Sequence, residues 1–430
     1  MQANQEHPSP KARNYGKYQN EIYFKGMIQG QSPSMTTDSR LLEEQAKKHL
    51  GERSFNYVAG GAGERATMDA NRLAFRQWKM IPRMLRPTTV RDTTVDLFGT
   101  KYDSPVLIAP IGVQSIFHAD RETGVAEVAA EIGVPYIMST AASSTIEEVA
   151  AASDKGYHNG QLSPATAGLG HGQRWYQLYW PHDDEITLSL LQRAKENHFS
   201  VLVVTLDTWA LAWRPADLDN AYVPFVIGTG NQVGFSDPVF RRKFAEKNDG
   251  KKPEDDILAA AIMWETIVFS GKAHSWDQLK LLRDNWEGPI VLKGIQHVDD
   301  AKTALEWGMN GIIVSNHGGR QLDGAIGSLS VLPEISAAVG SSMTVLFDSG
   351  IRTGVDVIKA LCLGAQAVLV GRPWVYGLGI GGKRGARDAL RAILADLDQS
   401  MGLSGIASVK DCTKEMVRFL QYPGDSNASN

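Results

Sequence analysis

The chain has 430 residues, of which 43% are apolar and 21% are charged, and its formal net charge is -4 at pH 7. The apolar fraction is enough for a sizeable core, and the small negative charge argues against binding to nucleic acid or to an acidic membrane. No apolar run could span a bilayer, and two cysteines are too few for a disulfide framework or a metal site, so we expect a soluble, cytoplasmic protein without bound metal.

Residues 1–104 come before any regular repeat of elements. They contain a helix-like stretch at residues 38–49 and a glycine-containing segment at residues 55–63. We expect this region to form a helical N-terminal extension that packs on the main domain.

A repeating pattern, a short Val/Ile/Leu-rich run followed by a helix-like stretch, extends from residue 105 to about residue 410. The eight apolar runs lie at residues 106–110, 136–140, 175–179, 201–207, 290–293, 311–316, 345–348 and 367–372. Helix-like stretches between them include residues 145–151, 186–197, 298–307 and 354–363. Strands that alternate with helices predict a parallel sheet, and eight such units favour an α/β fold of the (β/α)8 TIM-barrel type over an open, doubly wound sheet.

Two segments fall outside this pattern. The connection between the fourth and fifth runs is far longer than a usual strand–helix connection, and its section at residues 237–256 is densely charged. Such an insertion is typical of a lid or of a disordered segment, and we interpret residues 215–275 as a lid over the mouth of the fourth strand. Residues 411–430 are expected to form a C-terminal segment that ends in a disordered tail from Gly424.

Polar side chains occupy the ends of most predicted strands, and in a barrel these ends meet at one face, where reactive groups gather. The residues concerned are Gln177, Tyr179, Thr205, Asp207, Lys293, Ser315, His317, Asp348 and Arg372. Taken singly, each has an ordinary structural interpretation: Asp207 could cap the next helix, Lys293 could lie at a solvated rim, and His317 could be a satisfied structural histidine. Their occurrence together on successive strands favours an active site.

The run SNHGGRQ at residues 315–321 carries the clearest chemistry. The imidazole of His317 can exchange a proton near neutral pH, and Asp207 could orient it and stabilise its charged form. Arg320 presents a planar set of donors that suits a carboxylate or a phosphate, and Arg214 adds a second positive charge. These residues predict proton removal from a hydroxyl or an adjacent carbon of an anionic substrate.

No side chain of this set can accept the two electrons that oxidation of an alcohol releases, so a redox reaction would require a cofactor. Glycines and arginines of strands seven and eight could bind a phosphate group, although solvated arginines in ordinary turns are the alternative. They are Gly350, Arg352, Gly371 and Arg372. A phosphate-bearing flavin would suit this site, with Lys293 near its ring.

The motifs SNHGGRQLDGA, LKGIQ, DSGIRTGVDVIKALCLGA and VGRPWVYG resemble those of the FMN-dependent α-hydroxy acid oxidase and dehydrogenase family. The similarity extends from about residue 14 to residue 408. The resemblance implies FMN as the cofactor, a small 2-hydroxy acid and O2 as reactants, and a homo-oligomer of four or more chains.

The same resemblance implies roles for individual residues. His317 would be the active-site base, with Asp207 as its partner. The substrate's carboxylate and hydroxyl would be bound by Tyr57, Arg214, Arg320 and Tyr179. The implied FMN contacts are Ala109, Pro110, Ile111, Gly112, Ser139, Gln177, Thr205, Lys293, Ser315, Asp348, Gly350, Arg352, Gly371 and Arg372.

Two positions bear on the substrate and on the fate of oxygen. Within the family, the chain is most similar to the lactate 2-monooxygenase type, which implies oxidation of L-lactate by O2 to acetate, CO2 and water. Gly112 stands where the family's oxidases commonly carry alanine, and we expect the missing methyl to leave space beside the flavin, so that pyruvate and peroxide stay together and react. Ala141 stands where many short-chain oxidases have tryptophan, so a longer or aromatic 2-hydroxy acid is an alternative to lactate.

The alternatives within the family are an oxidase that releases the 2-oxo acid and hydrogen peroxide, and a dehydrogenase that uses another electron acceptor. A phosphate-substrate isomerase on a similar barrel and a catalytically silent binding protein are alternatives from other classes. The intact set of His317, Asp207, Arg214 and Arg320 disfavours the silent protein.

Overall fold

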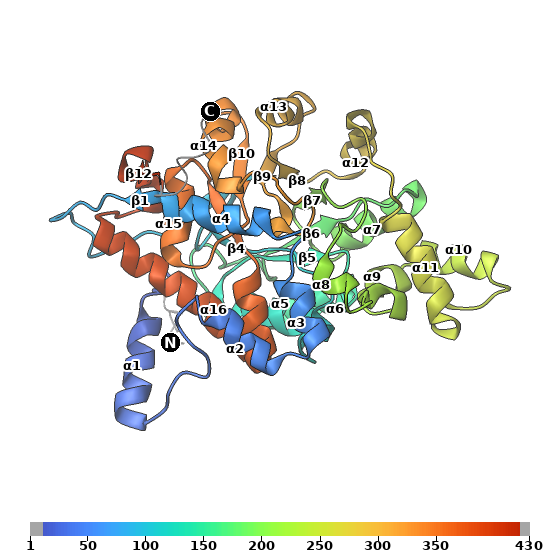
Figure 1. Cartoon of the computed structure of the whole chain (residues 1–430), viewed down its shortest axis with the longest axis horizontal. Coiled ribbons are helices and arrows are strands. Elements are labelled where there is room, and N and C mark those ends of the chain that lie inside the picture. The colour runs from blue at the N-terminus through green and yellow to red at the C-terminus, as the bar shows by residue number, and fades with distance from the viewer. Residues whose placement is uncertain (1–11, 422–430) are drawn as a thin grey trace, which may run out of the picture.

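The computed structural model describes residues 12–421 and contains a closed barrel of eight parallel strands surrounded by helices (Figure 1). The strands follow one another in chain order around the barrel, and the last of them pairs with the first. They are β4 (Val106–Ile108), β5 (Tyr136–Ser139), β6 (Arg174–Leu178), β7 (Leu202–Thr205), β8 (Ile290–Ile295), β9 (Gly311–Val314), β10 (Thr344–Phe347) and β11 (Ala367–Val370). The prediction of a (β/α)8 barrel is therefore confirmed.

A helix follows each barrel strand and covers the outside of the barrel. The eight helices are α5 (Arg121–Ile132), α6 (Ile146–Asn159), α7 (Asp184–Glu196), α12 (Leu279–Asn285), α13 (Val298–Glu306), α14 (Ser328–Val339), α15 (Gly354–Cys362) and α16 (Arg372–Ser404). Every residue of β4, β5, β6, β7, β9 and β11 is buried, which is why these strands appear in the sequence as continuous apolar runs. Side chains set where helices begin: Thr145 and Glu148 form a reciprocal cap on α6, and Thr353 caps α15.

The N-terminal region packs on the barrel through helices and two small sheets. Its elements are α1 (Lys17–Gln29), α2 (Leu42–His49), α3 (Glu52–Ala59), α4 (Ala66–Gln77), β1 (Trp78–Met80), β2 (Val95–Leu97) and β3 (Thr100–Tyr102). β1 pairs antiparallel with β12 (Val417–Phe419), so the N-terminal region and the end of the described chain share one sheet. α2 lies against α16, and α4 lies against the turn His317–Gly319.

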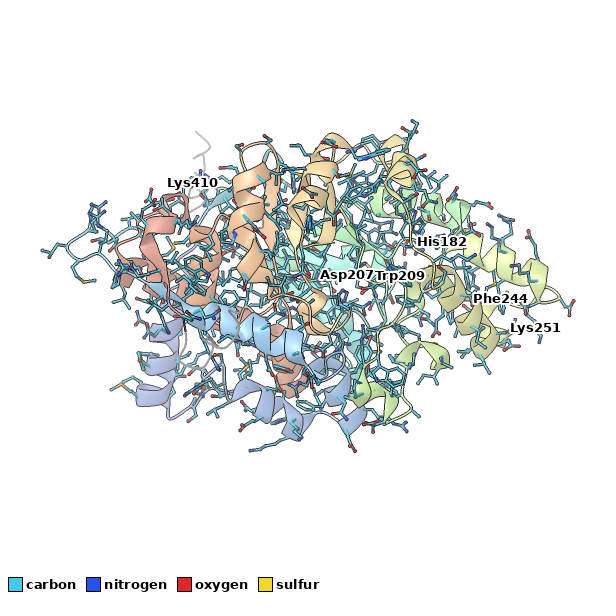
Figure 2. The ribbon with its side chains drawn as sticks, turned by 45° about the horizontal axis from the view of Figure 1, so that its top comes forward. His182, Asp207, Trp209, Phe244, Lys251 and Lys410 are labelled. Carbon is cyan, nitrogen blue, oxygen red and sulfur yellow. The ribbon has the colours of Figure 1, made fainter. Side chains whose placement is uncertain are left out.

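The insertion after β7 is a folded helical region that projects from one side of the barrel, away from α1 and α2 (Figure 1). It contains α8 (Pro215–Leu218), α9 (Gln232–Phe235), α10 (Pro238–Lys247) and α11 (Ile257–Val268). Asp237 is fully buried, caps α10 through two backbone N–H groups, and accepts a 2.7 Å hydrogen bond from Ser189 on α7. Phe240, Phe244 and Trp264 add a small aromatic core. The charged section is thus anchored to the barrel, and Phe244 and Lys251 lie far from Asp207 (Figure 2).

Some predicted boundaries differ from those of the structure. α6 continues to Asn159, well past the predicted end at residue 151. α2 begins at Leu42 instead of residue 38, because Asp38 accepts a hydrogen bond from the Arg40 N–H in a turn. The tail predicted from Gly424 lies outside the described residues. Between residues 12 and 421, no helix combines the length and apolarity that crossing a bilayer demands.

Candidate active site

A cleft of about 960 Å³, including its open mouth, lies where the barrel strands end. Its walls come from the segments after β4, β9, β10 and β11, together with the N-terminal extension and the insertion. Because all eight strands are parallel, their carboxyl ends present these segments at one face of the barrel. Residues distant in sequence therefore meet in one cleft.

Most residues predicted for the site line this cleft. They are Tyr57, Ala109, Pro110, Ile111, Gly112, Tyr179, Arg214, Lys293, His317, Arg320, Asp348, Gly350, Arg352, Gly371 and Arg372. The structure thus brings together residues from the N-terminal extension, from the segment after β7 and from six further strand ends.

Five predicted residues do not line the cleft: Ser139, Gln177, Thr205, Asp207 and Ser315. They support residues at the strand ends. Ser315 Oγ accepts a 3.1 Å hydrogen bond from Lys293 Nζ, and Gln177 Nε2 donates a 2.9 Å bond to Thr205 Oγ1. Direct contact of Ser139, Gln177, Thr205 and Ser315 with the cofactor stays a prediction.

His317 and Asp207 form a hydrogen-bonded pair whose groups suit acid–base chemistry. Nδ1 of His317 lies 2.8 Å from Oδ1 of Asp207, and Thr208 Oγ1 donates a 2.8 Å bond to the same oxygen. Because a carboxylate only accepts, Nδ1 carries the proton, and Nε2 keeps the lone pair that can take a proton from a substrate. Asp207 therefore orients the imidazole and does not act as a helix cap.

Burial and charge set the protonation states of this pair. Burial lowers the pKa of His317 from 6.5, despite the opposing charge of Asp207, so the imidazole is neutral at pH 7. Burial alone would raise the pKa of Asp207, but the charges of His317 and Lys293 hold it well below its usual range. The resting pair is a carboxylate beside a neutral imidazole, which is the state that a general base requires.

Arg214 and Arg320 form an anion site on one wall of the cleft. Burial and the charge of Arg320 lower the pKa of Arg214 to about 10. Arg214 Nε donates a 2.9 Å bond to the Arg320 carbonyl, while Arg320 donates to the carbonyls of Tyr57 and Gly60 and lies over the Tyr57 ring, 5.0 Å from its centroid. Two adjacent guanidinium groups with no carboxylate partner within residues 12–421 suit an anionic ligand.

Arg352 and Arg372 form a second anion site, after β10 and β11. Burial lowers the pKa of both, that of Arg372 to about 10. The guanidinium of Arg372 donates to three backbone carbonyls, those of Val58, Gly318 and Gly60, and neither arginine meets a carboxylate within the described chain.

The residues of this second site fit a phosphate-bearing flavin. A Cβ built on Gly371 would meet only ordinary contacts, the nearest at 3.5 Å, so the protein does not fill the space beside this backbone. An anion could therefore approach the Gly371 backbone beside the buried guanidinium of Arg372 and the part-buried one of Arg352. Lys293, which is 4% exposed and lies 3.5 Å from Asp348, adds a positive charge to the same cleft.

Gly112 does not open free space, contrary to the expectation from sequence. A Cβ at this position would lie 2.5 Å from the carbonyl oxygen of Ala141 and 2.8 Å from its Cβ. The two segments approach closely because glycine has no side chain, and the Val113 N–H donates a 2.7 Å bond to the same carbonyl. Ala141 therefore occupies the space that the missing methyl was expected to leave.

An apolar wall completes the cleft. Ala141 is buried beside Val113 and Phe225, and Phe269 lies within 5.4 Å, between ring centroids, of both Phe225 and Tyr179. Burial raises the pKa of Tyr57 and of Tyr179, so both phenols stay protonated and can donate hydrogen bonds. The wall suits an apolar substituent on the substrate.

Reasoning from the sequence missed several residues that hold the site together. Gln321 donates to the carbonyls of Asp207 (2.7 Å) and Ala210 (2.9 Å), and its Oε1 accepts from Arg214. The side-chain amides of Asn71 and Asn316 bond to each other at 2.9 and 2.8 Å. Gln321 and Asn316 stood inside the SNHGGRQ run, but no local pattern shows which distant atoms they bind.

Comparison with known proteins matches this chain to one family. The family described as FMN-dependent dehydrogenase matches residues 46–419. The chain is 57% identical to an FMN-dependent α-hydroxy acid dehydrogenase of Penicillium citrinum over 412 residues, which cover 96% of this chain and 98% of that protein. It is 48% identical to an FMN-dependent α-hydroxy acid dehydrogenase of Schizosaccharomyces pombe, with 94% and 96% of the two chains covered.

The fold has a close counterpart among solved structures. A crystal structure of mandelate oxidase superposes with a TM-score of 0.74 at 34% identity, covering 89% of this chain and 98% of that one. Identity at this level over nearly the whole length relates the two proteins in family as well as in fold.

Proposed function

Because the chain belongs to the FMN-dependent dehydrogenase family and is an FMN-dependent α-hydroxy acid oxidoreductase, we propose that it oxidises an (S)-2-hydroxy acid to the 2-oxo acid and passes the electrons to O2. The observation that carries this proposal is the pairing of neutral His317 with Asp207 beside two separate arginine pairs. One arginine pair serves the substrate's carboxylate and the other serves the phosphate of FMN.

The substrate would be held by its carboxylate. Arg214 and Arg320 bind this group, and Tyr57, whose ring lies against Arg320, donates a further hydrogen bond. Tyr179 lies on the same cleft and donates a bond near the substrate hydroxyl. These contacts fix the hydroxyl-bearing carbon in one orientation, which favours one enantiomer.

The proton leaves the substrate to Nε2 of His317. As the imidazole becomes charged, the Asp207 carboxylate at Nδ1 stabilises it without moving. FMN, when bound, accepts the two electrons that the side chains cannot take, together with the second hydrogen that the substrate loses. We propose that the FMN contacts predicted from the sequence hold this cofactor. These contacts begin with the segment Ala109–Gly112 and end with Arg372.

The apolar wall favours a substrate larger than lactate. Ala141 is small, and the aromatic rings of Phe225 and Phe269 face the same cleft. One solved relative with this fold is a mandelate oxidase, whose name denotes an aromatic 2-hydroxy acid. We therefore place aromatic or long-chain 2-hydroxy acids ahead of L-lactate, which rests on sequence resemblance alone.

The fate of oxygen is a separate question. Because Ala141 fills the space beside Gly112, the argument for retention of the 2-oxo acid loses its main support. Release of the 2-oxo acid and hydrogen peroxide is thus the outcome that we propose, and lactate 2-monooxygenation to acetate and CO2 is the alternative. Product stoichiometry in air separates them, because monooxygenation yields the shortened acid and no peroxide.

Three further predictions concern the whole molecule. We propose the insertion at residues 215–275 as a lid, since it contributes Phe225 and Phe269 to the cleft. A homo-oligomer of four or more chains and a cytoplasmic location stay predictions.

Anaerobic flavin reduction tests the proposed function. FMN-loaded protein is mixed with L-lactate, glycolate, (S)-mandelate and (R)-mandelate, and the loss of oxidised-flavin absorbance is followed. We expect the fastest reduction with (S)-mandelate and none with its enantiomer. His317→Gln should bind FMN and fail to be reduced. An isomerase would show no bleaching with any of these acids, which would refute the proposal.

A further inference from the structure

The loop that carries His317 has an unusual backbone. His317, Gly318 and Gly319 have φ of 58°, 66° and 73°, so three consecutive residues lie in the left-handed region. Glycine adopts this region freely, but a residue with a Cβ does so at a cost. His317 is therefore held in a conformation that it would not keep without support from its surroundings.

Ser349, on the segment after β10, supplies such support on both sides of His317. Its Oγ accepts hydrogen bonds from the Asn316 N–H (3.3 Å) and from the Gly318 N–H (3.0 Å), and it donates a 2.8 Å bond to Asp348 Oδ1. Ser349 is 7% exposed and has a φ of 84°, so it too is in the left-handed region. The serine keeps this costly conformation while its hydroxyl fixes the peptides that flank the base.

Other contacts complete the hold on this loop. Arg372 donates a 3.0 Å bond to the Gly318 carbonyl, and the Asn71 amide pairs with that of Asn316. Within the described chain, Ser349 Oγ is nevertheless the only hydrogen-bond partner of the Gly318 N–H. Removing this oxygen would leave the buried Asn316 N–H and the part-buried Gly318 N–H without this acceptor.

We propose that Ser349 is a positioning residue for catalysis. It holds the left-handed loop so that the His317 imidazole keeps its hydrogen bond to Asp207 and keeps Nε2 directed toward the substrate. The proposal rests on the proposed function, because His317 must be the base. A hydroxyl two residues past β10 thus acts on the reaction through the backbone of the loop that follows the neighbouring strand β9.

Two substitutions at Ser349 separate the effect of losing the hydroxyl from the effect of the left-handed backbone conformation. Ser349→Gly removes the hydroxyl and also the cost of a left-handed Cβ, whereas Ser349→Ala removes the hydroxyl and keeps that cost. Ser341→Gly, at an exposed loop position, is the matched control. For each protein we would measure FMN content, the thermal midpoint, the anaerobic rate of flavin reduction, the KM and the pH profile.

The expected results follow from the geometry. Ser349→Gly should fold, bind FMN fully and have a higher thermal midpoint than Ser349→Ala. Its flavin reduction should be about 10- to 100-fold slower with KM unchanged, since small misplacements of a catalytic group have effects of this size. Because the Asp207 charge raises the pKa of His317, a looser pair should shift the acid limb of kcat/KM to lower pH. Ser341→Gly should behave as wild type.

Other outcomes would overturn the proposal or its premise. Wild-type reduction rates and an unshifted acid limb in Ser349→Gly would overturn the role of Ser349, provided that His317→Gln is inactive. FMN loss with a normal rate in the loaded fraction would also overturn it, because Ser349 would then act on the cofactor. Wild-type reduction in His317→Gln would refute the proposed function itself.

Discussion

The substitution Gly112→Ala tests whether the missing side chain at residue 112 leaves open space beside the flavin or allows the backbone at Gly112 to pack closely against Ala141. The new Cβ would lie 2.5 Å from the Ala141 carbonyl oxygen, 2.8 Å from the Ala141 Cβ and 3.1 Å from its carbonyl carbon. None of these atoms can rotate away, because two belong to the backbone and the third is a Cβ. One of the two segments must therefore move.

The magnitude follows from two contributions. Overpacking a tight contact costs about 1–3 kcal/mol, and the shift also weakens the Val113-to-Ala141 hydrogen bond, which contributes about 1 kcal/mol. The sum is about 2–4 kcal/mol. At roughly 2 °C per kcal/mol for a large domain, the thermal midpoint should fall by about 4–8 °C.

The assay is thermal unfolding of FMN-loaded protein, with Gly26→Ala as the control. Gly26 lies inside α1, and a Cβ there would meet one backbone oxygen at 3.9 Å, so alanine should be neutral or slightly stabilising. Products formed in air are measured on the same samples. An unchanged midpoint for Gly112→Ala, together with a change from one product set to the other, would refute the packing argument and restore the interpretation of Gly112 as open space.

Three other substitutions test the charges of the site. Asp207→Asn should slow flavin reduction by about 10- to 100-fold, because a charge-assisted bond to the imidazolium becomes a neutral one. In wild type, kcat/KM should fall as the pH drops through the pKa of His317, which lies below 6.5. In Asp207→Asn this fall should occur at still lower pH, because the Asp207 carboxylate raises the pKa of His317. A shift of the fall to higher pH would contradict this assignment. Arg214→Lys should raise KM about 10- to 100-fold with a smaller change in kcat, because lysine lacks the planar pair of donors; an unchanged KM in steady-state assays would exclude Arg214 from carboxylate binding. Arg372→Met should weaken FMN binding by about one to two orders of magnitude, measured by fluorescence titration, and equal affinity would exclude a phosphate contact.

The barrel could be predicted from the sequence because its signal is local. Most barrel strands are fully buried on both faces and therefore appear as apolar runs, and helical stretches follow these runs. The end of α6 shows where local signals fail. Gly156 would ordinarily argue against a helix, yet it lies inside α6, because a Cβ there would be 1.9 Å from the Glu127 carbonyl of α5. The close packing of two helices, which no local pattern displays, decides that boundary.

Some residues of the candidate site could likewise be predicted from local sequence signals, and others could not. Residues that end strands, such as His317, Lys293 and Asp348, could be predicted because the barrel brings strand ends to one face. Ser349 and Gln321 could not, because their roles depend on which loop lies opposite and on backbone angles. The interpretation of Gly112 was wrong for this reason: the sequence shows that a methyl is missing but not that Ala141 occupies its place.

The arrangement of charges explains why this cleft needs two anions. Arg320 lowers the pKa of Arg214 and also that of Arg372, so its charge acts on both arginine pairs. Repulsion among these buried cations disfavours the folded chain until anions bind, and a ligand that binds only the folded state stabilises it by mass action. An uncharged alcohol would meet the same base at His317 but would leave Arg214 and Arg320 without a counter-ion. These charges therefore favour a 2-hydroxy acid over a simple alcohol, and we propose that the apolar wall around Ala141 then selects among such acids by size.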